Sequence, residues 1–271
     1  MKRFRLFAGP NGSGKSTIIK NARNSLVNGR PLDFGVYVNA DDIAVDLAKG
    51  TFTFATYEMD KITMVHLAEY ASISGLFRNG FNEEALYEAI TLTGENVELN
   101  AKNLVEMVAQ LLSNFLIDQL LQAGKKCTME TVFSHFSKVQ FMEQANSLGY
   151  KVYLYFVTTS NPEINVERVK LRVASNGHNV PENRIRERYI KSLDLMYAAA
   201  QLAYQAYFFD NSFGPDQHQL VAHFKVTDGN KRNWGKHNLQ LCCPNCHVFT
   251  DNYKGKNIKK GRVAQMEEAQ S

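Results

Sequence analysis

The sequence has 271 residues, 44% of them hydrophobic, and a formal net charge of +4. This length predicts one large α/β domain or two smaller ones, with enough apolar residues for a sizeable core. No apolar run is long enough to cross a bilayer and the N-terminal apolar stretch is too short for a secretory signal, so we expect a cytoplasmic protein with no membrane partner. Three of the four cysteines lie between positions 242 and 246, which is not the pattern of a secreted disulfide framework.

The charge is unevenly distributed along the chain. Residues 231–271 contain eight Lys or Arg and three Asp or Glu, whereas residues 1–230 contain 23 and 24. We therefore expect any attraction to nucleic acid to be weak and to reside in the C-terminal tail, not in the body.

A glycine-rich segment lies between a predicted strand at 3–8 and a predicted helix at 15–28. It matches the P-loop pattern G-x-x-x-x-G-K-[ST], whose glycines let backbone N–H groups surround an anion at a helix N-terminus. Lys15 would reach the β- and γ-phosphates of a nucleoside triphosphate, and the Ser16 hydroxyl would ligate its Mg²⁺. The predicted nucleotide-binding residues are Gly9, Pro10, Asn11, Gly12, Ser13, Gly14, Lys15, Ser16 and Thr17.

Two adjacent carboxylates follow the second predicted strand, at 34–39. A phosphotransferase needs a carboxylate that orients the acceptor hydroxyl and takes its proton, and either Asp41 or Asp42 suits that role. Each also suits the N-cap of the helix that starts at Ile43, and the pattern does not choose between them.

The rest of the body alternates between helices and strands. Residues 51–125 are predicted to be mostly helical, with an insert at about 51–100 and an amphipathic core helix over 104–121. Strands are predicted at 126–133, 150–158, 207–211 and 220–226. The strand at 150–158 is apolar on both faces, as in a parallel sheet covered by helices. This order predicts an α/β P-loop NTPase fold with a doubly wound, mainly parallel sheet, a helical insert and a short irregular C-terminal tail.

Several charged residues fall near the carboxyl edge of the predicted sheet, where such sheets bind ligands. Glu130 falls late in the third strand, near the carboxyl edge. Arg168 and Arg172 lie four residues apart on one helix face and could meet the charge on a transferring phosphoryl group. Arg184, Arg186 and Arg188 on the next helix could do the same, although surface arginines are usually solvated or weakly paired. Taken alone, His178 more often reflects a hydrogen bond within a loop than catalysis.

Several segments in series resemble the zeta toxin family of P-loop kinases. The resemblance covers residues 3 to about 228 and rests on segments 9–17, 38–44, 129–131, 149–150, 168–173, 177–181 and 209–212. It implies an ATP- or GTP-dependent kinase that phosphorylates a sugar hydroxyl of UDP-N-acetylglucosamine, and that can be the toxin of a pair with an antitoxin partner. Segment 132–135, Val-Phe-Ser-His, departs from the family pattern, and the helical stretch at 51–100 is longer than the family's.

The resemblance also implies roles for individual residues. Asp41 corresponds to the general base, and Glu130 to the residue that helps bind the sugar nucleotide. Arg172 is the better match to the arginine that faces the phosphates, with Arg168 second. The segment that contains His178 stands where a second arginine occurs in other members, so we include His178 among the substrate-binding candidates.

The C-terminal tail resembles the end of an HNH endonuclease. On that resemblance Cys243 and Cys246 would be zinc ligands, whereas a structural zinc site needs four ligands and no second pair is present. A disordered basic tail is the simpler interpretation. We place the domain boundary so that residues 1–229 form the kinase domain and 230–271 form the tail.

Two further hypotheses compete with the kinase. The chain could be a P-loop ATPase coupled to DNA binding or processing through its tail, which would show DNA-stimulated activity and steep salt dependence. It could also be a nucleotide-binding regulator, which would bind ATP without acceptor-dependent turnover.

Overall fold

The computed structural model describes residues 1–27, 29–59, 61–77, 81–175, 177, 179–214, 218–227 and 232–235. These residues divide into two compact units. The first unit contains Met1–Phe7, Ile19–Thr131 and Phe136–Tyr153. The second unit contains Ala8–Ile18, Val132–His135 and the described residues from Leu154 onward.

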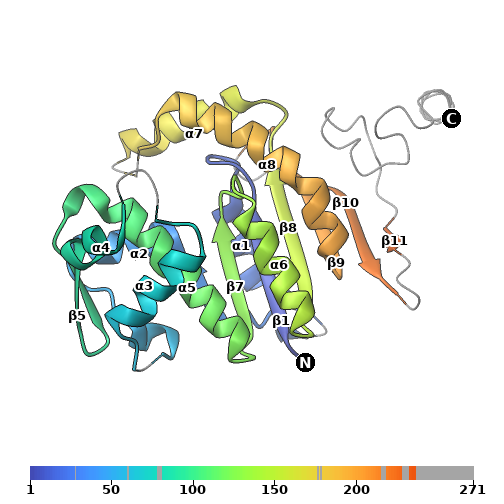
Figure 1. The fold of residues 1–271 in the computed structure, drawn as a ribbon. Coiled ribbons are helices and arrows are strands. Elements are labelled where there is room, and N and C mark those ends of the chain that lie inside the picture. The colour runs from blue at the N-terminus through green and yellow to red at the C-terminus, as the bar shows by residue number, and fades with distance from the viewer. Residues whose placement is uncertain are drawn as a thin grey trace, which may run out of the picture. The chain divides into compact units, whose positions relative to one another are not determined.

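A seven-stranded sheet has the order β11-β10-β9-β8-β1-β7-β4 (Figure 1). Its strands are β1 (Arg3–Ala8), β4 (Val36–Asn39), β7 (Cys127–Thr131), β8 (Lys151–Thr158), β9 (Gln205–Asp210), β10 (Gln219–Val226) and β11 (Arg232–Trp234). β4 pairs with β7 in parallel, whereas β10 is antiparallel to both of its neighbours. The neighbouring strands β8, β1, β7 and β4 are far apart in sequence and are connected through helices. The predicted α/β fold with a doubly wound, mainly parallel sheet is therefore confirmed.

In the first unit, helices and two antiparallel strand pairs, β2–β3 and β5–β6, accompany strands β4 and β7. The elements are α1 (Lys15–Asn24), β2 (Leu26–Val27), β3 (Arg30–Pro31), α2 (Ala40–Lys49), η1 (Phe54–Tyr57), α3 (Met64–Ile73), α4 (Glu83–Ala89), β5 (Ile90–Thr93), β6 (Asn96–Leu99), η2 (Lys102–Leu104), α5 (Val105–Gln122) and α6 (Ser137–Ser147); α1 begins in the second unit. Edge-to-face aromatic contacts join Phe54 and Tyr70 to Phe115 of α5, at ring separations of 6.0 and 5.6 Å. The core of this unit thus forms around α5.

The predicted helical insert at about 51–100 is only partly helical. After α4 the chain forms the antiparallel hairpin β5–β6, with Gly94 at its turn at φ 60°. The sequence predicted mostly helix over 51–125, but α4 ends at Ala89. The alternation of buried Ile90 with exposed Thr91 has the period of a strand.

One helix of the described residues, Lys102–Gln122, is long and apolar enough to cross a membrane by length and composition. The sequence prediction that no such stretch exists was wrong in this respect. However, 61% of the apolar window is buried inside the protein. This burial is what the core helix of a packed unit shows, in agreement with the predicted core role of residues 104–121.

In the second unit, two long helices follow β8. They are α7 (Pro162–Ala174) and α8 (Glu182–Leu202). Asn161 caps α7 by accepting hydrogen bonds from the N–H groups of Glu163 and Ile164, and Pro162 occupies the first turn. The two helices enclose an aliphatic cluster of Val166, Val169, Val180 and Ile185.

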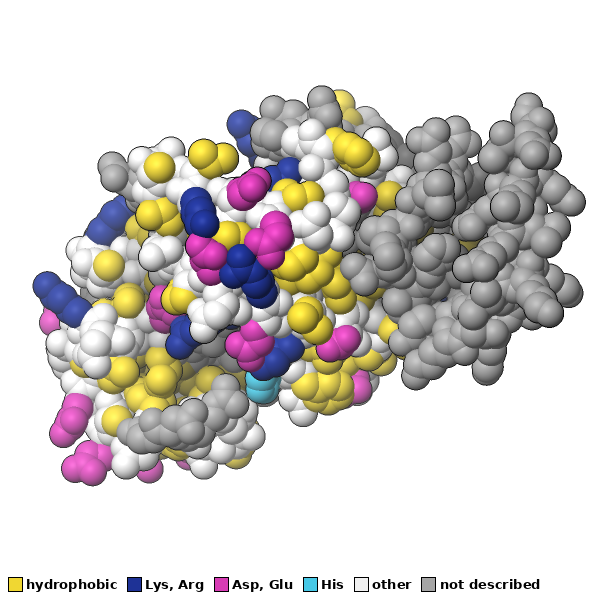
Figure 2. All heavy atoms as spheres, turned by 90° about the horizontal axis from the view of Figure 1, so that it is seen from above, with side chains coloured by type: hydrophobic (Ala, Val, Ile, Leu, Met, Phe, Trp, Pro, Cys, Tyr) yellow, Lys and Arg dark blue, Asp and Glu magenta, His cyan; other side chains and the backbone are white. Residues whose placement is uncertain are grey.

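Ion pairs connect the outer surfaces of these helices. The Arg186 guanidinium lies 2.8 Å from Glu163 and 3.2 Å from Glu182, and Lys170 lies 2.7 Å from Glu182. Figure 2 shows acidic and basic side chains interleaved on the face that it presents. On this face, cations and anions alternate and do not form a continuous basic patch.

Candidate nucleotide-binding and acceptor sites

The P-loop lies in the second unit, between the end of β1 and the start of α1. Gly9, Gly12 and Gly14 all have positive φ, at 144°, 75° and 92°. A Cβ on Gly9 would lie 1.9 Å from the carbonyl oxygen of Val157, and a Cβ on Gly14 would lie 2.0 Å from Nδ2 of Asn211. The loop therefore needs glycine for its conformation and for space, as the motif predicts.

Two buried asparagines hold the loop from outside the motif. Nδ2 of Asn211 donates to the carbonyl of Ser13 at 2.8 Å, and Nδ2 of Asn165 donates to the carbonyl of Asn11 at 2.6 Å. Thr159 donates in turn to Oδ1 of Asn165. The residues are 1% (Asn211) and 0% (Asn165) exposed, so the P-loop conformation is set by α7 and by the residue that follows β9.

Sequence reasoning had assigned neither asparagine a role. Asn211 was part of the family resemblance without a stated function. Asn165 adjoins the buried Val166 on α7, and a polar residue at a buried helical position was the only available signal.

The loop fits a polyphosphate group. Nζ of Lys15 donates to the carbonyls of Gly9 and Pro10 at 3.0 and 3.1 Å, which keeps the ammonium over the loop. The Ser13 hydroxyl is buried and has no hydrogen-bond partner among the described residues. Ser16 lies in the first turn of α1, where its hydroxyl could reach a metal held by phosphates. The described residues contain no group of three His, Cys, Asp or Glu side chains that could hold a metal.

Three arginines of the second unit differ in their surroundings. Nη1 of Arg168 is buried without a hydrogen-bond partner in the described chain, and burial lowers the pKa of this guanidinium while the charge of Asp210 opposes the shift. The stem of Arg172 packs against Gly177, where a Cβ would lie 2.5 Å from Cγ of the arginine. Nη1 of Arg188, on α8, lies 3.4 Å from Oδ1 of Asn11 in the P-loop.

The structure thus brings Arg188 to the P-loop, one of three arginines of this helix that the sequence offered as alternatives to Arg168 and Arg172. The helical spacing of the buried Ile185 and Tyr189 shows which side of α8 faces inward, and Arg188 adjoins that side. Arg186, by contrast, is held in ion pairs at the surface. Three sequence candidates, His178, Cys243 and Cys246, lie outside the described residues.

The candidate acceptor residues lie in the first unit. Parallel pairing places Asn39, the last residue of β4, opposite Glu130 of β7. The Tyr37 hydroxyl donates to Oε2 of Glu130 at 2.5 Å. Burial raises the pKa of Asp42, and the charge of Glu130 raises it further. The register of β4 and β7 thus places Asp42 and Glu130 near the carboxyl ends of these strands.

Neither of the two adjacent aspartates caps helix α2. Oδ1 of Asn39 accepts the N–H of Asp41 at 3.1 Å, so Asn39 is the N-cap and neither aspartate is. Both side chains are exposed, but only Asp42 lines the pocket described next.

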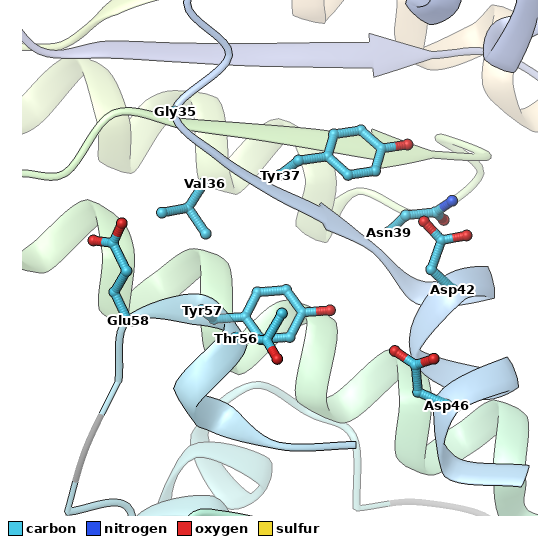
Figure 3. A pocket seen from close by; sticks show the side chains of 9 residues that line it. All are labelled: Gly35, Val36, Tyr37, Asn39, Asp42, Asp46, Thr56, Tyr57 and Glu58. Atoms are coloured by element: carbon cyan, nitrogen blue, oxygen red, sulfur yellow. The ribbon is translucent and has the colours of Figure 1, made fainter. Parts of the chain in front are cut away.

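That pocket has a volume of about 420 Å³. Figure 3 shows side chains from β4, α2 and η1 around it. It is lined by Gly35, Val36, Tyr37, Asn39, Asp42, Asp46, Thr56, Tyr57 and Glu58. A cavity with aromatic walls and a few polar groups is a usual form of small-molecule site.

Comparison with known families identifies the chain. The family model described as zeta toxin matches residues 87–224, which is half of the sequence. The chain belongs to the zeta toxin family. The matched residues include Glu130, Arg168, Arg172 and Arg188, while the P-loop and the two aspartates precede them. The family match ends before the tail, so the resemblance of the tail to an HNH endonuclease is not supported by it.

Individual relatives are distant. An uncharacterized protein of Haemophilus influenzae is 29% identical over 111 residues, which cover 40% of this chain and 79% of that protein. A crystal structure of the AvrRxo1-ORF1:ORF2 complex has a TM-score of 0.50 at 13% identity, covering 86% of this chain and 60% of that one. The present chain thus spans about three-fifths of that structure's length. A chain of the PezAT toxin–antitoxin system of Streptococcus pneumoniae has a TM-score of 0.46 at 12% identity, with coverages of 98% and 84%. At these identities, a similarity concerns the fold alone.

Proposed function

We propose that this zeta toxin family member is an ATP-dependent kinase that phosphorylates a sugar hydroxyl, with UDP-N-acetylglucosamine as the expected acceptor. The observation that carries the proposal is the P-loop, whose glycine cradle is held by Asn165 and Asn211 and covered by the Lys15 ammonium. A rigid cradle of N–H groups, a lysine and a helix N-terminus form a binding site for nucleotide phosphates. ATP·Mg²⁺ supplies the phosphoryl group when it is bound.

Cationic residues of the second unit would counter the negative charge of the phosphoryl group during its transfer. Lys15 is held within the loop, and Arg188 already contacts it through Asn11. Arg168 carries a buried N–H group that has no protein partner in the described chain, as expected for a donor meant for a ligand. Arg172 remains the arginine to which the family resemblance assigns phosphate contact. These cations would stabilise the phosphoryl group as its bond to the β-phosphate breaks.

The residues of the first unit would activate the acceptor. As the hydroxyl oxygen forms its bond to phosphorus, a carboxylate accepts the hydroxyl proton and ADP leaves with the electrons of the broken bond. The family resemblance assigns this role to Asp41, whereas the pocket and the raised pKa favour Asp42. Glu130, held by the Tyr37 hydroxyl, would bind the acceptor.

A direct assay tests the proposal. Transfer from labelled ATP to UDP-N-acetylglucosamine is measured for wild type, Lys15→Ala, Asp41→Asn and Asp42→Asn, with Asp194→Asn on the exposed surface of α8 as a matched control. We expect the wild type and the control to transfer label, and Lys15→Ala to lose transfer. The aspartate that acts as the base should lose about 10²-fold or more in kcat while nucleotide binding persists. Absence of transfer to this and to other hydroxyl acceptors, with ATP still bound, would contradict the kinase and favour a nucleotide-binding regulator.

A protein partner is a separate part of the proposal. The PezAT structure comes from a toxin–antitoxin system, and the present chain shares the family name of zeta toxins. We propose that an antitoxin restrains this chain too. Expression of the wild type should then arrest growth while Lys15→Ala does not, and normal growth with active kinase would contradict the toxin role.

A further inference from the structure

Basic residues gather where three strands of the first unit begin. Lys2 precedes β1, Lys125 and Lys126 precede β7, and Lys151 is the first residue of β8. The carbonyl of Lys2 accepts the N–H of Lys151 at 3.0 Å, so the starts of β1 and β8 lie side by side. The N-terminus of the chain lies at this amino edge of the strands (Figure 1), whereas the P-loop follows the opposite end of β1.

Two arginines of β1 lie near this edge without a counter-charge. Arg3 and Arg5 are two positions apart in the strand, so their side chains share one face of the sheet. Arg5 is only 2% exposed. Its Nε and Nη1, and the Nε of Arg3, are buried and have no hydrogen-bond partner among the described residues. Neither arginine forms an ion pair with a carboxylate of the described chain.

The groups around Arg5 do not neutralise it. The carboxylate of Asp33 lies 2.6 Å from Nζ of Lys126 and accepts the N–H of Gly35 at 3.0 Å. The hydrogen bond from Lys126 is the main cause of the lowered pKa of Asp33, and the charge of Arg5 contributes least. The Tyr153 ring lies 5.5 Å from the Arg5 guanidinium and attracts the cation, but a ring face does not replace a hydrogen-bond acceptor.

A buried charge without a partner is costly, and a guanidinium does not lose its proton in proteins. We propose that Arg3 and Arg5 form a binding site for a small oxyanion of the phosphate class at the amino edge of the sheet. Two guanidinium groups balance the charge of a phosphate dianion, and their N–H groups supply hydrogen bonds to its oxygens. Arg3 is only partly buried, which gives the anion its access from solvent. The site is separate from the proposed kinase site and does not depend on it.

Thermal unfolding of the full chain tests the class of anion. The wild type is unfolded at pH 7 in sodium phosphate, sodium acetate and sodium chloride of equal ionic strength. We expect phosphate to raise the Tm by about 3 °C or more above its value in chloride, because a ligand that binds only the folded chain stabilises it. Acetate, with a single charge, should give about half of that rise or less. Equal Tm values in the three salts, or an acetate rise as large as that of phosphate, would overturn the proposal.

Variants separate this site from the P-loop, which also attracts phosphate. The P-loop is unchanged in every variant, so a difference between variants isolates the amino edge. Arg5→Met, which replaces the buried charge by an apolar side chain, should reduce the phosphate-dependent rise by about 2 °C or more, and Arg3→Gln should reduce it by a smaller amount. Arg30→Gln, at an exposed position of β3, should keep the full rise. A rise in Arg5→Met equal to that of the wild type would assign all of the stabilisation to the P-loop and refute the site.

A direct measurement covers the case in which Arg5→Met does not fold. The Nε–H signals of Arg3 and Arg5 are followed by NMR of the wild type as phosphate is added, with Arg30 as the internal control. We expect the two buried signals to shift together and to saturate, while the Arg30 signal stays in place. Signals of Arg3 and Arg5 that do not move with phosphate would overturn the proposal, whatever the Tm values show.

Discussion

The side-chain amide of Asn211 donates to the backbone carbonyl of Ser13 at 2.8 Å, across 198 positions of sequence. The same nitrogen occupies the space in which a Cβ of Gly14 would lie. The P-loop glycine and the asparagine after β9 therefore depend on each other, because the glycine leaves the space that the asparagine side chain fills. This contact links the nucleotide site to the strand that follows α8.

We predict that Asn211→Ala weakens ATP binding without abolishing the fold. The substitution leaves the buried Ser13 carbonyl without its donor, at a cost of about 1–3 kcal/mol. The KM for ATP should rise at least severalfold and the Tm should fall, while the acceptor KM stays the same. Asn183→Ala, at an exposed position of α8, is the control. An unchanged ATP affinity would show that the loop keeps its conformation without Asn211.

The acid limb of the pH–activity profile should report on Asp42. Burial, then the charge of Glu130, raises the pKa of Asp42, so the proton acceptor is lost at a higher pH than for an ordinary carboxylate. Glu130→Gln removes that charge and should lower the Asp42 pKa, which moves the acid limb of kcat/KM to lower pH even as acceptor binding weakens.

The control for this profile is Glu69→Gln, at an exposed position of α3, which should leave the limb in place. If Glu130→Gln also leaves it in place, Asp42 is not the titrating base, and Asp41 becomes the better candidate.

Arg188→Gln should lower kcat/KM for ATP more than Arg184→Gln does. Arg188 reaches Asn11 of the P-loop, whereas Arg184 is exposed on the same helix. We expect the first variant to lose about tenfold or more in kcat/KM for ATP, because a cation near the phosphates is removed. Steady-state kinetics with varied ATP measure the effect, and equal losses in both variants would assign them to a general change of charge on α8.

The buried Lys138 should make stability depend on alkaline pH. Its ammonium donates to Oδ1 of Asn114, which also accepts from Gln110, and burial lowers the lysine pKa to about 7. The unfolded chain, where a lysine pKa lies near 10.4, then binds more protons than the folded chain above pH 7. The free energy of unfolding should consequently rise between about pH 7 and pH 10.

The variant Lys138→Met should flatten that rise, whereas Lys20→Met, at an exposed position of α1, should preserve it. Urea unfolding at pH 7, 8, 9 and 10 measures both. A wild-type stability that falls steadily over this range, with no difference in slope for Lys138→Met, would contradict the prediction.

The parts of this protein that follow local rules could be predicted from the sequence. The P-loop, its strand and its helix were predicted because glycine conformation and anion binding depend on adjacent residues. The alternation of strands and helices was sufficient for the α/β class. The hairpin β5–β6 was missed because its apolar residues also fitted helical spacing next to α4.

The contacts that complete the candidate site depend on tertiary structure. Asn165, Asn211 and Arg188 lie more than 150 positions from the P-loop residues that they contact, and no local pattern connects them. The preference for Asp42 over Asp41 in the pocket likewise depends on the start of α2 at Asn39 and on the register between β4 and β7. The assignments of Asp41, Arg172 and His178 from the resemblance remain predictions.

The hydrogen bond from Asn211 to Ser13 also sets an order of events during synthesis. Asn211, the donor that fixes the P-loop, lies 198 positions after Ser13 and is therefore synthesised much later than the loop that it holds. A nascent chain that stops short of the end of β9 has the complete nucleotide motif and lacks its support. The nucleotide site would in this way lack its support until β9 and the residue that follows it have been made.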